Sequence, residues 1–455
     1  YLKQMNRKCE SALENGAEPV RVLSSVLGQN YPSDELEYSW KKLMQNHPHD
    51  SICCCSVDEV QDEMATRFNK SKQVADYLVS EGKRYIADKI NTKEYEKYKN
   101  ALPFVVFNTA GRERTSVVSV EIDVTRKSGW LKKCAYDLDE INVPNYKLID
   151  SDGNSIPFKI EDLGVKFGYD LPKDKFRQPY MARRVRVTFE AENISAVGYK
   201  TYALVEGDTE KVTDTLVSSE NCMENDAIRV EINKNGSLNV TDKASGRTYK
   251  GVAYYEETGD LGNEYMYKMP EGSKAITTQD TVAKIELAED EPYRAMYKIT
   301  NTITVPKSGD DNFEDEKSHM VFFKERVGGR SNDTVEMKIE TFVSLDKNGK
   351  GVKIKTRFDN EVKDHRVRIM VPTGINSDVH KADSVFEVVT RNNRHNAGWN
   401  NPSACEHEQG FVSIDDGEKG IAVANIGLYE YEMLPDLDNT IAVTILRAVG
   451  EMGDW

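Results

Sequence analysis

Hydrophobic positions in the first part of the chain recur at helical spacing. One stripe of this kind follows a first predicted helix and consists of Leu2, Met5, Cys9 and Leu13. Asn15-Gly16 is expected to end this helix, and Pro19 suits the first turn of a second helix that stops near Gly28. The pattern therefore predicts a helical region at this end of the chain.

Two further helices are predicted on either side of a short loop. The upstream helix has Ser33 as its N-cap and must end near Asn46, because Pro48 disfavours a helical conformation in the residue before it. The downstream helix begins at Ser56-Val-Asp-Glu59, which has the form of a capping box, and runs towards Lys89.

From about residue 101 the apolar positions alternate with a period of two, which predicts strands. The alternating positions include Val118, Val120, Ile122 and Val124, then Val185, Val187 and Phe189, and later Met337, Ile339, Thr341 and Val343. Asp150-Ser-Asp-Gly153 has the composition of a turn, and Asn233-Lys-Asn-Gly236 separates two strands of a predicted hairpin. Strands and turns at this density favour sandwiches over parallel α/β units.

We therefore predict an α+β multidomain protein in which an N-terminal helical bundle precedes antiparallel β-sandwich domains. The predicted divisions are a middle domain resembling a three-helix bundle at residues 1–97, a small β domain at 98–208 and a large β-sandwich domain at 209–455. We expect the large domain to be truncated at its C-terminus. The acidic, polar passage at 206–220 is the predicted linker. A chain of 455 residues is too long for one ordinary core.

Composition limits the classes of partner. A net charge of −15 argues against a nucleic-acid backbone as a partner. No apolar run approaches the roughly 20 residues that span a bilayer, so we expect no membrane partner either. Seven cysteines, three of them adjacent, look unlike a secreted disulfide framework and favour a cytoplasmic location. The sequence leaves open an upstream targeting signal and a homo-oligomer.

The segment from His47 to Val60 concentrates the most chemistry, with two imidazoles, a carboxylate and three adjacent thiols ahead of a helix. Such side chains bind metal ions or activate water when a pocket holds them. A hydrogen-bonded His-Asp pair is the plain alternative for His49 and Asp50. The consecutive cysteines diverge too much to hold one zinc ion together, so we interpret Cys53–Cys55 as free, buried thiols.

Three other segments carry weaker signals. Cys405 and His407 could share one face of a strand, but an ordinary strand edge is the favoured interpretation. The run from Ser308 to Lys317 is expected to be an exposed loop, because it lacks the ligand order of a calcium-binding loop. The segment Asn393–Trp399 suits either a sugar-binding surface or a loop anchored by tryptophan, and Arg447 receives no assigned role.

The chain resembles glycoside hydrolase family 38 in an ordered series of blocks that covers nearly its whole length. The helical part contributes Tyr1–Asn6 with Glu10, Trp40–Asp50 and Ser56–Val60. The β part contributes Phe104–Thr109, Asn225–Ile232, Gly259–Tyr265 and Gly427–Tyr431. This family comprises zinc-dependent, retaining α-mannosidases, and the bacterial branch is the nearest match.

The resemblance implies a role for two residues. His49 corresponds to a zinc ligand, and Asp50 corresponds to an aspartate that hydrogen-bonds a hydroxyl of the mannose to be cleaved. The family commonly has glycine where this chain has Cys54, so an adjusted turn is expected there. One Zn²⁺ per complete active site is implied.

The resemblance also implies a part that this chain does not contain. Family members carry a catalytic barrel of about 250 residues or more ahead of the helices. That barrel supplies a His-x-Asp pair of zinc ligands and the nucleophilic aspartate. No His-x-Asp sequence occurs at any of the seven histidines of this chain, which are His47, His49, His319, His365, His380, His395 and His407. We therefore assign no catalytic residue here and expect the fragment by itself to be inactive.

Two hypotheses follow from the sequence. The first is that the chain is part of a zinc-dependent, retaining α-mannosidase that removes terminal α-linked mannose from oligosaccharides. The second is a non-catalytic carbohydrate-binding or interaction protein. Zinc content and hydrolysis of an aryl α-mannoside would distinguish them.

Overall fold

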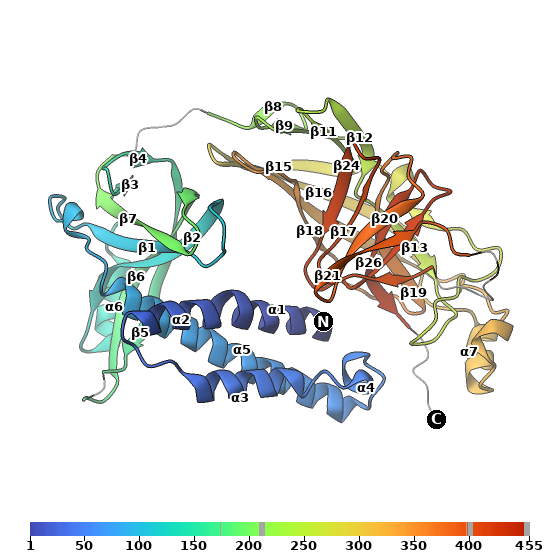
Figure 1. Ribbon diagram of the computed structural model, residues 1–455, viewed down its shortest axis with the longest axis horizontal. Coiled ribbons are helices and arrows are strands. Elements are labelled where there is room, and N and C mark those ends of the chain that lie inside the picture. The colour runs from blue at the N-terminus through green and yellow to red at the C-terminus, as the bar shows by residue number, and fades with distance from the viewer. Residues whose placement is uncertain (173, 209–213, 397, 399–403, 450–455) are drawn as a thin grey trace.

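The computed structural model describes residues 1–172, 174–208, 214–396, 398 and 404–449 (Figure 1). Helices drawn in blue lie along one side of the molecule, a small β region lies at one end, and a large β region lies at the other. Every strand pair in the described part is antiparallel. The predicted combination of helices with antiparallel sheets is confirmed, although sheets make up most of the structure.

The helical region is formed by residues 2–95. Its elements are α1 (Leu2–Ala12), a π-helical turn (Leu13–Ala17), α2 (Glu18–Val26), α3 (Ser33–Met44), α4 (His49–Ile52), α5 (Asp58–Ala87) and a 3₁₀ turn (Lys93–Tyr95). Their shared core consists of Cys9, Leu13, Ala17, Leu36, Leu43, Met64, Phe68, Ala75 and Leu78. The expected helical bundle is thus confirmed in part, as a compact layer within a mainly β structure. No helix in the described residues is long and apolar enough to cross a membrane.

Asn15-Gly16 does not end the first helix, which corrects one prediction. The chain passes through these residues in the π-helical turn and continues into α2. Pro19 has no N–H to offer the carbonyl of Asn15, four residues earlier. That carbonyl instead accepts a hydrogen bond of 2.7 Å from Thr109 Oγ1 of the small β region. A tertiary contact therefore replaces the missing helical hydrogen bond.

The predicted caps are also wrong in detail. Ser33 is the first residue of α3 and Val57 is the N-cap of α5, and neither cap position uses a side chain. Ser56 Oγ instead accepts a hydrogen bond of 2.7 Å from Gln61 Nε2. The start of α5 is favoured by Asp58 and Glu59, whose negative charges complement the positive end of the helix dipole.

The small β region contains two facing sheets. One has the order β1 (Leu102–Asn108), β7 (Gly198–Glu206), β3 (Tyr146–Asp150) and β4 (Ser155–Ile156), and the other has the order β2 (Arg114–Lys127), β6 (Gln178–Ile194) and β5 (Phe158–Asp170). The alternating residues predicted from the sequence fill the space between them, with Val185, Val187 and Phe189 fully buried. A helix absent from the predictions, α6 (Leu131–Asp139), buries Cys134 and Leu138.

The described residues of the large β region form four sheets. The first has the order β12 (Arg247–Val252), β11 (Leu238–Asp242), β10 (Ile228–Ile232), β9 (Cys222–Glu224) and β8 (Val217–Ser219). The second has the order β14 (Ile276–Thr277), β13 (Tyr254–Gly259), β19 (His365–Val371), β26 (Thr440–Ala448), β25 (Glu430–Leu434) and β22 (Glu406–His407). The third has the order β15 (Lys284–Glu291), β16 (Arg294–Pro306), β17 (Thr334–Asp346) and β18 (Lys353–Arg357). The fourth has the order β21 (Glu387–Asn392), β20 (Val379–Ser384), β23 (Phe411–Asp415) and β24 (Gly420–Ala424).

One apolar core joins all four of these sheets. It takes Val230 from the first sheet, Val443 from the second, Tyr297 from the third and Val412 from the fourth. The predicted hairpin at Asn233–Gly236 is confirmed, since β10 pairs with β11 and Gly236 takes a φ of 84°. The described residues of this region also form two 3₁₀ turns, Thr278–Asp280 and Phe323–Glu325. The predicted domain boundary at 208/209 falls next to residues 209–213, which lie outside the described residues, so it stays untested. Trp399 lies outside them too, so the predicted role of the segment Asn393–Trp399 also stays untested.

The charged run from Ser308 to Lys317 is not an exposed loop. Residues Asp311–Ser318 form α7, and the Asp310 carboxylate caps it by accepting a hydrogen bond of 2.9 Å from the N–H of Phe313. Phe313 is fully buried, and Glu316 accepts hydrogen bonds from the N–H groups of Val327 and Gly328. One buried aromatic ring and one buried carboxylate therefore hold this acidic segment in a helix.

Gly82 allows α5 to approach α2 closely, and this contact yields a stability prediction. A Cβ at position 82 would lie 2.6 Å from Val20 Cγ1 and 3.1 Å from Arg21 Cδ. Gly82→Ala should therefore lower the free energy of unfolding by about 1–3 kcal/mol. In an open helix the same change would instead stabilise by about 1 kcal/mol. Denaturant unfolding followed by far-UV circular dichroism measures the difference. Ser80→Ala, on the exposed side of α5, is the control and should change little.

Candidate functional site

His49 and Asp50 are the first two residues of α4, a single helical turn between α3 and α5. The expected irregular loop is thus a short helix. The side chains of His49 and Asp50 are 84% and 68% exposed, and His49 Nε2 lies 2.9 Å from Asp50 Oδ1. His49 Nδ1 has no hydrogen bond to any described residue. The pair therefore offers one ring nitrogen and one carboxylate to a ligand that approaches from outside.

Helix α4 buries no residue completely, and only Ile52 packs partly against the helical core. Two side chains of α1 therefore help to hold it in place, one ahead of it and one behind it in the chain. Ahead of α4, His47 Nε2 lies 2.7 Å from Oδ1 of the buried Asn6. Behind it, Lys3 Nζ donates a hydrogen bond of 3.0 Å to the carbonyl of Ile52. The position of the His-Asp pair is thus set by side chains distant in the sequence.

The three consecutive cysteines are free, but they are not buried as expected. Cys53 is exposed, and Cys54 and Cys55 are partly exposed, because Ile52 is the residue that packs against the helical core. Cys54 has a φ of 68°, in the left-handed region that favours glycine. The turn after α4 therefore keeps a glycine-type backbone conformation despite the cysteine side chain.

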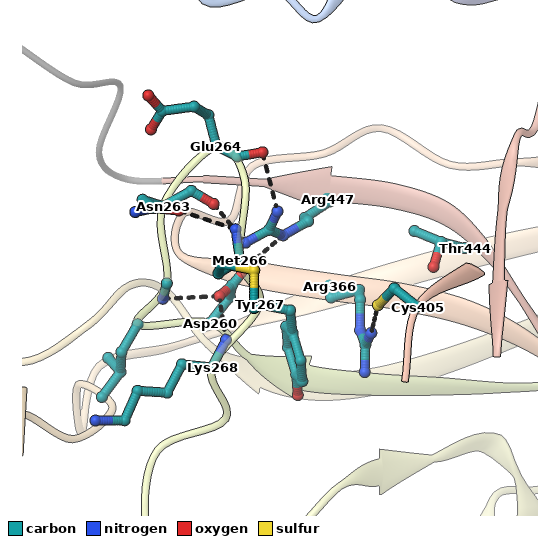
Figure 2. Close-up of polar contacts among 12 residues, drawn as sticks. Asp260, Asn263, Glu264, Met266, Tyr267, Lys268, Arg366, Cys405, Thr444 and Arg447 are labelled. Atoms are coloured by element: carbon teal, nitrogen blue, oxygen red, sulfur yellow. Dashed lines mark hydrogen bonds and ion pairs between the residues drawn. The ribbon is translucent and has the colours of Figure 1, made fainter. Parts of the chain in front are cut away.

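A loop of the large β region, residues 259–268, is fixed around one buried carboxylate (Figure 2). Asp260 Oδ1 accepts hydrogen bonds of 2.9 Å and 3.1 Å from the N–H groups of Gly262 and Lys268. Its Oδ2 accepts a hydrogen bond of 2.6 Å from Arg447 Nε, and Arg447 Nη2 donates to the carbonyl of Asn263 at 2.6 Å. Arg447 on β26 therefore anchors this loop, a role that the sequence did not reveal.

This loop meets the turn that follows α4. Tyr265 donates its hydroxyl to Cys55 Sγ at 3.8 Å, and Cys55 Sγ lies 3.5 Å from the carbonyl oxygen of Asp50. The hydrogen bond to Cys55 is the main cause that raises the pKa of Tyr265. The candidate site is thus the junction of α4 with the 259–268 loop.

A buried ion-pair network lies beneath the loop, on the second sheet of the large β region. Arg366 donates to Glu432 at 2.6 Å, and Arg368 pairs with both Glu432 and Glu256. The guanidinium of Arg366 lies 3.5 Å from the centre of the Tyr267 ring. Burial opposes the charge of Arg366, but Glu432 more than compensates, so the pKa of Arg366 is raised. The network gives the loop a polar base with matched charges.

Cys405 belongs to this network rather than to a metal site with His407. Its Sγ donates to Glu432 Oε1 at 3.0 Å, whereas His407 lies on the edge strand β22 beside Arg391. Burial, followed by the charge of Glu432, raises the pKa of Cys405. Among the described residues, no group of three or more His, Cys, Asp or Glu side chains could hold a metal ion.

A mainly apolar hollow lies away from this junction. It has a volume of about 810 Å³ between sheets of the large β region, with a mainly apolar lining that includes Leu238, Val371 and Val443. Neither His49 nor Asp50 borders it. The exposed junction at α4 is therefore the better candidate for polar chemistry.

Comparison with known families accounts for nearly all of the chain. Residues 1–86 match the alpha mannosidase middle domain, residues 99–206 match the glycosyl hydrolases family 38 C-terminal domain 1, and residues 223–451 match the glycosyl hydrolases family 38 C-terminal domain. The chain belongs to glycoside hydrolase family 38. The resemblance inferred from the sequence blocks is thereby confirmed.

Individual family 38 relatives agree along the whole chain. A protein from Halalkalibacterium halodurans named putative mannosylglycerate hydrolase is 39% identical over 100% of the chain and 51% of its own length. An alpha-mannosidase structure from Enterococcus faecalis is 40% identical with a TM-score of 0.95, over 100% of the chain and 52% of its own. A second family 38 structure from that organism is 39% identical with a TM-score of 0.93, over 53% of its own chain. The chain thus spans about half the length of these relatives.

The donor set at α4 can be compared with the zinc site that the family resemblance implies. A catalytic zinc takes about three protein ligands and keeps one position open. His49 supplies an exposed imidazole of the right kind, and the described residues offer no complete ligand set. The described residues therefore fit a zinc ion with a single imidazole donor, and a complete site requires further ligands.

The left-handed conformation of Cys54 leads to a stability prediction. Cys54→Gly should raise the free energy of unfolding by about 0.5–1 kcal/mol, because it removes the steric cost of a side chain at positive φ. Cys53→Gly is the matched control, since Cys53 has a φ of −70° and glycine there only adds flexibility. Thermal unfolding of both variants measures the contrast. Equal losses in the two variants would contradict the assigned strain.

The Arg447–Asp260 pair leads to a second prediction. Asp260 is fully buried, so Arg447→Ala leaves an uncompensated charge and should cost about 3 kcal/mol or more. The exposed pair Arg394–Asp436 offers the control, and Arg394→Ala should cause no measurable loss. Denaturant unfolding gives both values, and proteolysis within residues 259–268 should accelerate only in the Arg447 variant.

Proposed function

We propose that the complete protein is a zinc-dependent, retaining α-mannosidase that hydrolyses terminal α-linked mannose. Membership of family 38 and similarity to an alpha-mannosidase over the whole chain support this proposal. The observation that carries it is the exposed His49–Asp50 pair, held on α4 next to the loop around Asp260. An exposed imidazole and carboxylate suit a site that another part of the protein completes.

The two residues of the pair have different proposed roles. His49 binds zinc through its imidazole, and Asp50 accepts a hydrogen bond from a hydroxyl of the mannose to be cleaved. Zinc, when bound, supplies a Lewis acid for sugar hydroxyls. The turn at Cys54 and the contact from Tyr265 limit the movement of Asp50 around that hydroxyl.

The nucleophile and the acid/base are assigned to no residue of this chain. Retaining glycosidases use two carboxyl groups, one as nucleophile and the other as acid and then base. In the proposal these groups, with the remaining zinc ligands, belong to the part of the family 38 relatives that the chain does not span. The isolated chain is therefore proposed to be inactive.

Two substrate classes share the proposed chemistry. A mannose-containing oligosaccharide is the substrate that the family resemblance implies. The relative named putative mannosylglycerate hydrolase favours a second candidate, in which mannose is linked to glycerate. The proposed location is the cytoplasm, where exposed thiols such as Cys53 persist in reduced form.

Substitution of the His-Asp pair tests the proposal in the complete protein. Wild-type protein should contain about one zinc and hydrolyse an aryl α-mannoside. His49→Ala should lose zinc and lower kcat/KM on the order of 100-fold or more, whereas Asp50→Ala should lower kcat/KM and keep zinc. Metal analysis and steady-state kinetics measure these effects. Adding mannosylglycerate as a competing substrate shows which aglycone is preferred.

A matched imidazole provides the control. His319→Ala removes the exposed C-cap histidine of α7, whose polar partners among the described residues are Asp315 and Ser318, and it should leave zinc and turnover unchanged. Full activity in His49→Ala would refute its assignment as a ligand. Sugar binding by a wild-type protein without zinc or turnover would instead favour a non-catalytic carbohydrate-binding protein.

A further inference from the structure

One buried asparagine on α1 contacts the segment that leads into α4. Asn6 is 7% exposed, and its Oδ1 accepts a hydrogen bond from His47 Nε2 at 2.7 Å. Its amide nitrogen donates to Glu10 Oε1 at 2.7 Å, so both ends of the Asn6 amide are satisfied. With its amide oriented in this way, Asn6 can only accept at Oδ1, which requires His47 to carry its proton on Nε2.

The backbone between His47 and His49 is stiff. Pro48 separates them with a φ of −48°, and its ring restricts that angle. The carbonyl of Pro48 accepts hydrogen bonds of 3.0 Å and 3.1 Å from the N–H groups of Ser51 and Ile52. A displacement of His47 therefore moves the first turn of α4 as a unit rather than being absorbed between the two histidines.

The other contacts of α4 lie at or beyond its C-terminal end, where Ile52 packs against the helical core, and leave the end at His49 to the Asn6–His47 hydrogen bond. Lys3 reaches the carbonyl of Ile52 behind the helix, and Lys3 is exposed. Cys55 meets Tyr265 beyond the turn at a sulfur distance of 3.8 Å, which is a weak hydrogen bond. Asn6–His47 is the short, partly buried hydrogen bond, and it lies directly ahead of α4 in the chain, two residues before His49.

We propose that Asn6 and His47 are positioning residues that present the His49 imidazole to zinc, an inference that rests on the proposed function. Neither residue touches the metal or the sugar in this proposal. Asn6 fixes His47, and His47 fixes His49 through Pro48. The effect is therefore expected in metal affinity before it appears in the stability of the fold.

Zinc affinity of the complete protein tests the inference, measured by competition with a chromogenic chelator. Asn6→Ala and His47→Ala should each weaken zinc binding about 10-fold, at the lower end of losses known for residues that support metal ligands. The double variant should bind zinc no more weakly than the weaker-binding single variant, because both changes remove the same Asn6–His47 hydrogen bond. KM for an aryl α-mannoside should follow zinc occupancy and return to the wild-type value at saturating zinc.

A conservative replacement separates positioning from a general structural role. His47→Gln places an amide N–H near the original Nε2–H and should keep zinc affinity within about threefold of wild type. Asn15→Ala, which removes an exposed asparagine from the same helical run, is the control and should leave affinity unchanged. Both comparisons are made on variants whose thermal unfolding matches that of the wild type.

The outcomes distinguish this inference from the function on which it rests. Wild-type zinc affinity in both Asn6→Ala and His47→Ala would overturn the inference alone. Equal affinities of His47→Gln and His47→Ala would also overturn it, since the donated hydrogen bond would then be irrelevant. A wild-type protein that binds no zinc would overturn the proposed function, and the inference with it.

Discussion

Met64 and Phe68 of α5 are buried against α1 and α3, and this packing fixes the helices that flank α4. Both side chains lie on α5 and are fully buried among Cys9, Leu13 and Leu43. Because α4 buries no residue of its own, its place depends on that packing and on the polar contacts that α1 makes with it. The chemistry of the exposed turn thus depends on a core some distance beneath it, while the ion pairs under the 259–268 loop fix the opposite side of the junction.

Periodicity predicted the regular elements well where burial is one-sided. The alternating residues of β2, β6 and β17, and the stripe along α5, each face a core, so their pattern reports the fold directly. The misses have particular physical causes. Helix α6 is short and buries only two residues, so its pattern carries little signal. Helix α7 looked like a polar loop because Phe313 is its one buried apolar residue, while its other buried residue is the charged Glu316.

The sequence also suggested some parts of the candidate site and missed others. The segment from His47 to Val60 made His49 and Asp50 candidates, because its residue types and order are unusual within so short a stretch, and the family resemblance implied their roles. Their supports could not be found from local pattern, since Lys3, Asn6 and Tyr265 reach α4 across long separations in sequence. Arg447 was singled out without a role for the same reason. Its partner Asp260 lies in a matched block, but only the folded chain shows that the two meet.

The irregular turn between α1 and α2 has a consequence for how the regions stay in register. Pro19 offers no N–H to the Asn15 carbonyl, and the Thr109 hydroxyl, just after β1 of the small β region, donates a hydrogen bond to it. A residue with an amide hydrogen at position 19 would offer that carbonyl a partner close by. The hydrogen bond within the helix would then compete with the hydrogen bond from Thr109 that joins the two regions. The irregular turn thus helps to fix the helical region against the small β region. Replacing it with a regular helix would be expected to weaken the contact between the two regions.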